Sequence, residues 1–376
     1  MDENSDLGES RNSGTMDDMK TGKIKIAFVG GGTLGPVTPL LAVLRYMKKN
    51  KPNVEFIWLG TKYGPEKALL QKDLPFYDIP TAKLPRYPSF QWLSFPIKYF
   101  MAKYIARKIL KEEKPDIVVG AGGFTQVPVI LSANKQGIPS AIHQLDLVIG
   151  MSNKMIARKT ISVTTSFDYE ERVFPEPVES YQAATPVRFV KNDLVLKDQA
   201  AEHFGLDSSK PIIFVMGGGT GALSVNKAIG ELLDVLLEHT QIIHSTGRGK
   251  KETESRPGYF VTEFLSDDSI TAYSAADIVV TRAGMGAISE CSALEKPMIL
   301  IPLPNSPQEQ NAEQLGKQDG ALIVHQDVNF TSELLGAIRR LLKDVYMRDE
   351  FVMVAKDVIP TDDGKELAEI ILKHIQ

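Results

Sequence analysis

The stretch from Thr281 to Glu290 constrains the fold more than any other part of the chain. The apolar run at 277–281 predicts a buried strand, Gly284 and Gly286 follow it, and a helical pattern covers 287–294. Glycines at such a junction let backbone N–H groups approach an anion at the helix N-terminus. An ordinary strand–helix–strand unit, with glycines that only allow tight packing, is the alternative interpretation.

The same alternation of strand and helix runs along most of the chain. Apolar runs predict strands over 23–29, 54–59, 117–119, 140–143, 160–164, 211–216, 240–245, 259–264, 277–281 and 298–303. Helical patterns predict helices over 39–49, from 66, and over 127–136, 152–157, 225–237, 270–275, 287–294 and 364–375. This order is typical of a parallel, doubly wound α/β sheet. Both halves carry Gly-Gly-Gly-Thr directly after their first strand, so we expect two similar domains.

The length and composition also favour two globular domains. The chain has 376 residues, of which 43% are hydrophobic and 24% charged, as in ordinary folded proteins. Residues 1–22 are polar and acidic, and we expect a disordered tail there. We expect an N-terminal domain over 23–186, a C-terminal domain over 187–358, and a final helix within 359–376 that packs back on the N-terminal domain.

Several classes of protein are disfavoured by the same composition. The net charge of −4 gives no footprint for nucleic acid. The single cysteine, Cys291, excludes an internal disulfide and is expected in the core. No apolar run is long enough to span a bilayer, and no signal peptide opens the chain. These features predict a cytoplasmic protein that can still touch a membrane surface.

The two glycine turns are expected to bind a diphosphate rather than a dinucleotide cofactor. A dinucleotide fingerprint requires an acidic residue at the end of the second strand of each unit. That strand is followed by Gly60 and Thr61 in the first half and by Thr246 and Gly247 in the second. NAD and FAD are therefore disfavoured. A cleft lined by helix N-termini would still suit a diphosphate ligand.

Taken together, the motifs resemble a known family. They are Gly31-Gly32-Thr33-x-Gly35, Gly122-Gly123-Phe124, the segment at His143, Thr185-Pro186-Val187-Arg188, Gly217-Gly218-x-x-Gly221-Ala222, Val261-Thr-Glu-Phe264, Arg282-x-Gly284 to Glu290, and Gln308-x-x-Asn311-Ala312. In this order the motifs resemble the MurG family, within glycosyltransferase family 28. The resemblance implies the GT-B architecture, with two Rossmann-like doubly wound domains facing across a cleft. It also implies an inverting enzyme without a cofactor or a tightly held metal.

The resemblance further implies a reaction and a set of site residues. N-acetylglucosamine would pass from UDP-N-acetylglucosamine to the MurNAc 4-hydroxyl of undecaprenyl-diphosphate-linked lipid I, giving lipid II for peptidoglycan synthesis. By resemblance, Leu265 would meet uracil, Glu290 the ribose, and Arg188 a phosphate, while either Gln308 or Gln310 would contact the sugar. The full expected substrate-binding set is Thr33, Gly35, Asp146, Arg188, Gly219, Thr220, Gly221, Leu265, Gly284, Met285, Gly286, Glu290, Gln308 and Gln310.

The chain departs from the family pattern where the family would supply a catalytic histidine. Pro36 stands in place of that histidine and Leu34 in place of a glycine, while Asp146 replaces an asparagine. Thr185 and Ala283 are further replacements, of an asparagine and a serine. Because Pro36 has no titratable group, we predict that Asp146 is the catalytic base. His143 is the rival candidate.

A segment rich in aromatic residues predicts contact with a membrane. Residues 84–96 include Tyr87, Phe90, Trp92 and Phe95, and lysines and arginines follow up to Lys111. Aromatic rings interleaved with cations suit an interface with anionic headgroups, although a core helix with a charged solvent face is the alternative. Since a polyprenyl-linked acceptor stays in the bilayer, the resemblance favours peripheral attachment to the inner face of the cell membrane.

Two other functions remain open at the level of the sequence. A UDP-N-acetylglucosamine 2-epimerase uses the same two-domain plan, but it has no use for a basic and aromatic surface. A nucleotide-sugar-binding subunit without catalytic activity is the second alternative, and the absence of a histidine at Pro36 is its motivation.

Overall fold

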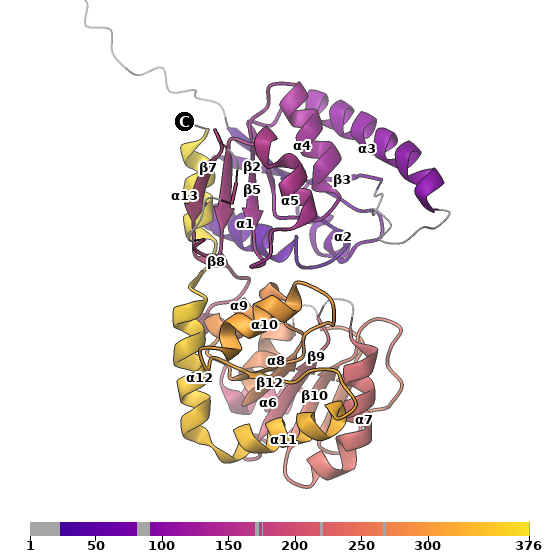
Figure 1. The fold of residues 1–376 in the computed structure, drawn as a ribbon, viewed down its shortest axis with the longest axis vertical. Helices are drawn as coiled ribbons and strands as arrows, with labels where there is room; N and C mark the ends of the chain where they lie inside the picture. The colour runs from indigo at the N-terminus through magenta and orange to yellow at the C-terminus, as the bar shows by residue number, and fades with distance from the viewer. Residues whose placement is uncertain are drawn as a thin grey trace, which may run out of the picture.

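Two α/β domains, each built on a parallel sheet, lie end to end in the molecule (Figure 1). The computed structural model describes residues 23–80, 91–169, 173–174, 176–218, 221–265 and 268–375. The expected tail at 1–22 and residues 84–90 of the aromatic segment lie outside these ranges.

The first sheet has seven strands in the order β3-β2-β1-β4-β5-β6-β7, and every pair is parallel. Its strands are β1 (Ile24–Val29), β2 (Val54–Gly60), β3 (Phe76–Asp78), β4 (Ile117–Gly120), β5 (Ser140–Gln144), β6 (Ser162–Thr165) and β7 (Glu179–Gln182). The helices between them are α1 (Thr38–Asn50), α2 (Pro65–Leu70), α3 (Gln91–Glu113), α4 (Gln126–Lys135) and α5 (Met151–Ile156). The carboxyl ends of β1, β4 and β5 meet at one edge of this sheet, which faces the second domain.

The second sheet has six parallel strands in the order β11-β10-β9-β12-β13-β14. They are β9 (Ile212–Met216), β10 (Gln241–Ser245), β11 (Tyr259–Thr262), β12 (Ile278–Thr281), β13 (Met298–Leu300) and β14 (Leu322–Ile323). Its helices are α6 (Lys197–His203), α7 (Leu223–Leu237), α8 (Ser269–Ala275), α9 (Met285–Ala293), α10 (Gln308–Gly316), α11 (Phe330–Lys343) and α12 (Val345–Val358). Strand β13 ends earlier than the sequence pattern predicted, because Pro302 has no N–H group to continue the ladder.

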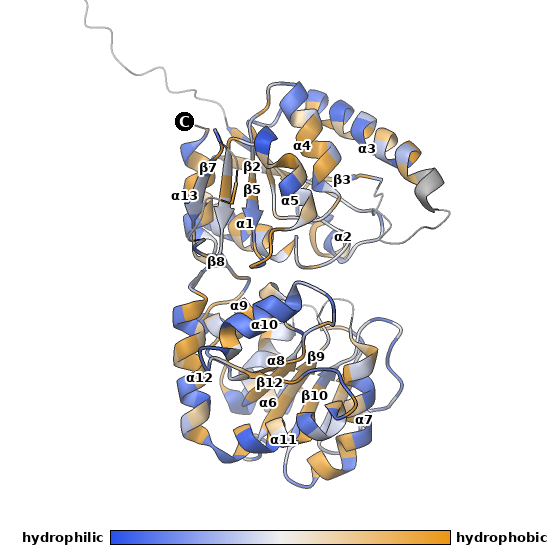
Figure 2. Cartoon of the chain, viewed as in Figure 1, coloured by the Kyte–Doolittle hydropathy of each residue, from blue (hydrophilic) through white to orange (hydrophobic). Residues whose placement is uncertain are grey.

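Both sheets are covered on both faces, as the doubly wound pattern predicted. Alternate side chains of β1 enter different apolar cores, with Ala27 and Val29 on one side and Ile26 and Phe28 on the other. The central strands β9 and β12 are hydrophobic along most of their length, and β10 contributes Ile242 and Ile243 to the two cores (Figure 2). Buried parallel strands of this kind need helices on both faces.

The C-terminal end of the chain returns to the first domain. After α12, the short strand β15 (Thr361–Asp362) pairs in parallel with β8 (Thr185–Pro186), in the segment that connects the domains. The expected last helix is α13 (Lys365–Lys373), whose Leu367 and Ile371 are buried in the apolar core shared with α1. The chain therefore crosses twice between the two domains (Figure 1).

Candidate active site

A cavity of about 590 Å³ lies between the two domains and receives residues from both. Most of the expected site residues line it, namely Thr33, Gly35, Asp146, Arg188, Leu265, Gly284, Met285, Gly286, Glu290 and Gln308. His143, Gly221 and Gln310 are not among the lining residues. Gly219 and Thr220 fall outside the described ranges. The cavity is large enough for a nucleotide-sugar-sized ligand.

The N-terminus of α9 forms one wall of the cavity. Strand β12 leads into this helix through Gly284, which occupies the N-cap position and offers no side-chain cap. The first turn of α9 carries no acidic residue. The first N–H groups of a helix have no partner within it and carry partial positive charge. This wall is therefore suited to an anion.

Glu290, one turn further along α9, is held by two side chains from other elements. Arg188 donates to both carboxylate oxygens, from Nε at 2.6 Å and from Nη2 at 3.1 Å, and the Tyr273 hydroxyl donates at 3.1 Å. Burial and the neighbouring Glu290 charge raise the pKa of Tyr273 well above its usual value. Arg188 comes from the segment between the domains. The sequence motif predicted a phosphate contact for Arg188, and in the structure this side chain also holds Glu290 in position.

The first glycine turn is held from behind by a buried carboxylate, Glu66. Its Oε1 accepts hydrogen bonds from the Thr61 N–H at 2.7 Å and hydroxyl at 2.6 Å, and its Oε2 accepts from the Gly32 N–H at 3.2 Å. A Cβ atom added to Gly31 or to Gly64 would approach a Glu66 oxygen to 2.2 or 2.0 Å. The sequence interpretation missed this role, although the glycines around the helix that contains Glu66 were a usable signal.

Asp146 connects the two domains across the cavity. Its Oδ1 accepts a hydrogen bond from Asn311 Nδ2 at 3.0 Å, and Asn311 Oδ1 accepts from the Leu147 N–H at 3.2 Å. Asn311 belongs to α10 in the second domain, whereas Asp146 and Leu147 follow β5 in the first. Burial raises the pKa of Asp146, and the Asn311 hydrogen bond opposes that shift.

The rival candidate for the base, His143, lies inside β5 and is fully buried. Its Nδ1 lies 2.9 Å from the Thr164 hydroxyl and its Nε2 lies 3.3 Å from the Ser166 hydroxyl. Burial lowers the pKa of His143 to about 4. Both ring nitrogens therefore contact neighbours on the adjacent strand or just beyond it.

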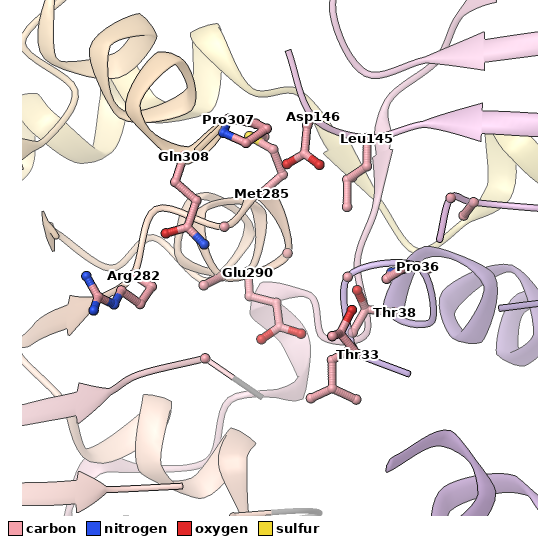
Figure 3. Close-up of a pocket in the computed structure, with 18 of the residues that line it drawn as sticks. Thr33, Pro36, Thr38, Leu145, Asp146, Arg282, Met285, Glu290, Pro307 and Gln308 are labelled. Carbon is pink, nitrogen blue, oxygen red and sulfur yellow. The ribbon is translucent and has the colours of Figure 1, made fainter. Parts of the chain in front are cut away.

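The two glutamines of α10 differ in position. Gln308 begins the helix and lines the cavity, and its Oε1 accepts a hydrogen bond from the Leu303 N–H at 3.0 Å. Gln310 is exposed. Figure 3 shows Gln308 beside Met285 and Glu290. Gln308 is therefore the better placed of the two for a sugar.

Arg282 adds positive charge to the cavity wall. It is buried, and its guanidinium donates to the Ile301 and Pro302 carbonyl oxygens and to the Ser224 hydroxyl. Burial lowers the pKa of this guanidinium. No carboxylate lies within ion-pair distance of Arg282 in the described ranges. Both Nη atoms already donate to protein oxygens, including Gln326 Oε1, so Arg282 contributes positive charge to this wall rather than a free donor.

Family models cover most of both domains. The glycosyltransferase family 28 N-terminal domain matches residues 26–165, and the glycosyltransferase family 28 C-terminal domain matches residues 212–350. The chain belongs to glycosyltransferase family 28. Its facing parallel-sheet domains form the GT-B architecture, and the resemblance found in the motifs is confirmed.

Individual relatives of this family 28 glycosyltransferase match it over most of their length. A protein of Lachnospira eligens named "UDP-N-acetylglucosamine--N-acetylmuramyl-(pentapeptide) pyrophosphoryl-undecaprenol N-acetylglucosamine transferase" is 36% identical, over 85% of this chain and 91% of the relative. A Bacillus anthracis protein with the same name, numbered 2, is 31% identical over 93% and 99%. The crystal structure of Acinetobacter baumannii MurG superposes with a TM-score of 0.66 at 25% identity, covering 93% of this chain and 99% of that one.

Proposed function

We propose that this protein transfers N-acetylglucosamine from UDP-N-acetylglucosamine to the 4-hydroxyl of N-acetylmuramyl-(pentapeptide) pyrophosphoryl-undecaprenol, the lipid I acceptor. The product is lipid II, the disaccharide-linked precursor of peptidoglycan. The observation that carries this proposal is the interdomain cavity, where Glu290 stands one turn into an uncapped helix in a chain whose full-length relatives bear the name of this transferase.

The donor occupies the wall formed by the second domain. Glu290 accepts hydrogen bonds from the ribose hydroxyls, and the Leu265 backbone meets the uracil. The N–H groups at Gly284, Met285 and Gly286 bind the diphosphate, for which uncapped helix N-termini are suited. Further donor contacts come from Gln308, which reads sugar hydroxyls, and from the second glycine turn at Gly219, Thr220 and Gly221.

The acceptor occupies the wall formed by the first domain, at Thr33, Gly35 and Asp146. The Asp146 carboxylate takes the proton of the attacking hydroxyl as the new bond to the anomeric carbon forms. The bond between that carbon and the UDP oxygen breaks, and UDP leaves with the electron pair. A base in hydrogen-bond reach contributes roughly 10²–10⁴-fold to the rate, and a raised pKa makes Asp146 a better proton acceptor than an ordinary aspartate.

The division of labour follows the two domains. Residues 23–186 form the acceptor and membrane domain, 187–358 form the donor domain, and 359–376 belong with the first. Such a plan lets a donor bind on one side of the cleft while a lipid-linked acceptor approaches from the other.

Helix α3 is the part of the first domain that contacts the membrane. It lies at the outer edge of that domain (Figure 1), and its described part carries an exposed apolar stripe at helical spacing, made of Ile97, Phe100, Met101 and Tyr104. Exposed cations flank the stripe at Lys98, Arg107, Lys108 and Lys111. Among the helices of the described ranges, none is long and apolar enough to cross a bilayer. An apolar stripe with flanking cations binds the surface of an anionic leaflet, here the inner face of the cell membrane.

One assay separates this function from the alternatives. The protein is given UDP-N-acetylglucosamine with and without a lipid I analogue, and UDP, disaccharide product and epimerised sugar are measured. UDP release that depends on the acceptor, with stoichiometric disaccharide, is expected. Epimer formation without an acceptor would instead identify a 2-epimerase, and UDP-sugar binding without any turnover would identify a non-catalytic subunit.

A further inference from the structure

Thr38, which begins α1, carries a hydroxyl that has no visible structural purpose. The residue is only 7% exposed, and its Oγ1 atom has no hydrogen-bond partner within the part of the chain that the structure describes. A buried hydroxyl without a partner costs free energy, and most buried polar groups in native proteins are paired. A hydroxyl that remains unpaired at the wall of a cavity therefore suggests a ligand.

The Thr38 hydroxyl faces the other domain at the start of α9. A Cβ atom added to Gly286 would lie 3.2 Å from Thr38 Oγ1, which is a tight contact, so the glycine eases the close approach of the two walls. Both residues line the interdomain cavity, and Figure 3 shows Thr38 on one wall and Glu290 on the opposite one. The hydroxyl and the first N–H groups of α9 thus converge on one small volume from two domains.

This volume is suited to an oxyanion. The first turn of α9 has neither a side-chain cap nor an acidic residue, and the same is true of the first turn of α1. The N-terminus of α9 favours negative charge at this point. The start of α1 adds little to it, because the Thr38 N–H donates to the Leu34 carbonyl oxygen and Pro39 has no N–H. A hydroxyl can donate to a phosphate oxygen there, in a hydrogen bond strengthened by the charge.

We propose that Thr38 donates its hydroxyl proton to a phosphate oxygen of the UDP-sugar diphosphate, so that the first domain contributes directly to donor binding. This inference rests on the proposed function, because the diphosphate is that of its donor. It assigns the contact to the donor, since the Thr38 hydroxyl points at Gly286 on the wall that also carries Glu290. Donor binding then favours the closed arrangement of the two domains, in which Thr38 reaches α9.

The chain offers a matched control in Thr125, at the N-cap of α4. This residue is also buried, and its Oγ1 likewise has no partner among the described residues, but it does not line the cavity. The variants are Thr38→Val, which keeps the shape and removes the hydroxyl, Thr38→Ser, which keeps the hydroxyl, and Thr125→Val.

UDP affinity is measured by calorimetry for the full chain and each variant, together with thermal unfolding without ligand. Thr38→Val is expected to bind UDP about 10-fold more weakly, the loss of one charge-assisted hydrogen bond. Thr38→Ser and Thr125→Val are expected to bind like the wild type. Both valine variants should unfold at the same or a higher temperature, because each loses an unpaired buried hydroxyl. If Thr38 binds the donor, Thr38→Val lowers the UDP affinity without lowering the unfolding temperature. A purely structural role of Thr38 would not give this combination.

Three results would overturn the inference. Thr38→Val that binds UDP as tightly as Thr125→Val does would remove Thr38 from the donor site. A defect confined to the KM for the lipid acceptor, with UDP affinity unchanged, would assign the hydroxyl to the acceptor instead. If the wild-type protein itself fails to bind UDP, the proposed function fails, and this inference fails with it.

Discussion

The Glu290 carboxylate is the proposed acceptor for the ribose hydroxyls, and it also forms an ion pair with Arg188. Glu290→Gln keeps the shape of the side chain and removes its charge. We expect UDP affinity to fall by about 1–3 kcal/mol, the worth of a hydrogen bond that involves a charged group. Calorimetry of UDP binding measures this loss directly.

The control for Glu290→Gln lies at the other end of the same helix. Glu295 directly follows Leu294, the C-cap residue of α9, pairs with Lys191 and Lys356, and does not line the cavity. Glu295→Gln removes an ion-paired carboxylate without touching the site, so its UDP affinity should match the wild type. Equal losses in the two variants would show that the Glu290 effect comes from the stability of α9 rather than from a ribose contact.

For Asp146, we predict how kcat changes with pH. Burial raises the pKa of this carboxyl, and a base works only when ionised. As the pH falls through the raised pKa, kcat should decline, and the decline should begin at a higher pH than for an ordinary aspartate near 3.9. Asp146→Asn, which keeps the acceptor oxygen that Asn311 contacts, should lose roughly 10²–10⁴-fold in kcat, together with this acidic limb.

The pH profile also distinguishes a base from a positioning residue. If Asp146→Asn transfers sugar at the wild-type rate and keeps the same acidic limb, then Asp146 is not the base. UDP affinity should stay near the wild-type value in this variant, since the donor contacts lie on the other wall. A parallel loss of UDP binding would point to a disturbed closure of the domains.

At single residues, the sequence predicted which residues lie at the cavity better than it predicted the contacts that they make. Local strand, glycine turn and helix signals were enough to bring Gly284, Gly286 and Glu290 to one cavity wall. The roles of Glu66 and Thr38 depend on atoms that come close only after folding, such as the Gly286 backbone opposite Thr38. No local pattern in the sequence encodes those distances.

At the scale of elements, apolar runs predicted the buried strands well because both faces of each sheet are covered. Helix α10 was missed, since it buries only Asn311, Ala312 and Leu315 and presents a mostly polar surface (Figure 2). Helix α11 was also missed, although Leu334, Ile338 and Leu341 recur at helical spacing and are buried. That periodicity could have been found from the sequence.

Helix α3 is expected to bind membranes through its exposed apolar stripe. Phe100 and Tyr104 are 67% and 71% exposed on its apolar stripe. Replacing both with serine should reduce binding to anionic vesicles, because their rings no longer enter the interface. Wild-type binding should weaken as salt rises, since screening reduces the attraction of the flanking lysines. Vesicle flotation measures both effects.

The matched control for α3 is on α12, where Tyr346 and Met353 are also strongly exposed. Serine at these two positions removes a similar amount of exposed apolar surface from the other domain. Vesicle binding should be unchanged in that variant, and transfer to a soluble acceptor analogue should be unchanged in both. If the two double variants lose vesicle binding equally, α3 is not the membrane-contacting element.

At the scale of the whole molecule, the two domains are tied by the connecting segment at β8 and by the return of the chain through α13. From the sequence we expected the last helix and its return to the N-terminal domain. Its partner α1 was not predicted, because this docking joins residues more than 300 positions apart. Gly364 packs directly against α1, since a Cβ atom added to it would lie 2.6 Å from the Val43 nitrogen. This close contact determines where the start of α13 docks on the first domain.

Ile371 tests this return of the chain. Its side chain is fully buried in the core shared by α13 and α1, whereas that of its neighbour Ile370 is partly exposed. Ile371→Ala should lower the free energy of unfolding of the first domain by about 2–5 kcal/mol, because it leaves a cavity between the two helices. Ile370→Ala removes the same atoms and should cost much less. Denaturant unfolding, followed by the fluorescence of the buried Trp58 in the first domain, measures both. Equal effects of the two substitutions would mean that α13 contributes helix propensity alone, and that the first domain is stable without the C-terminal end of the chain.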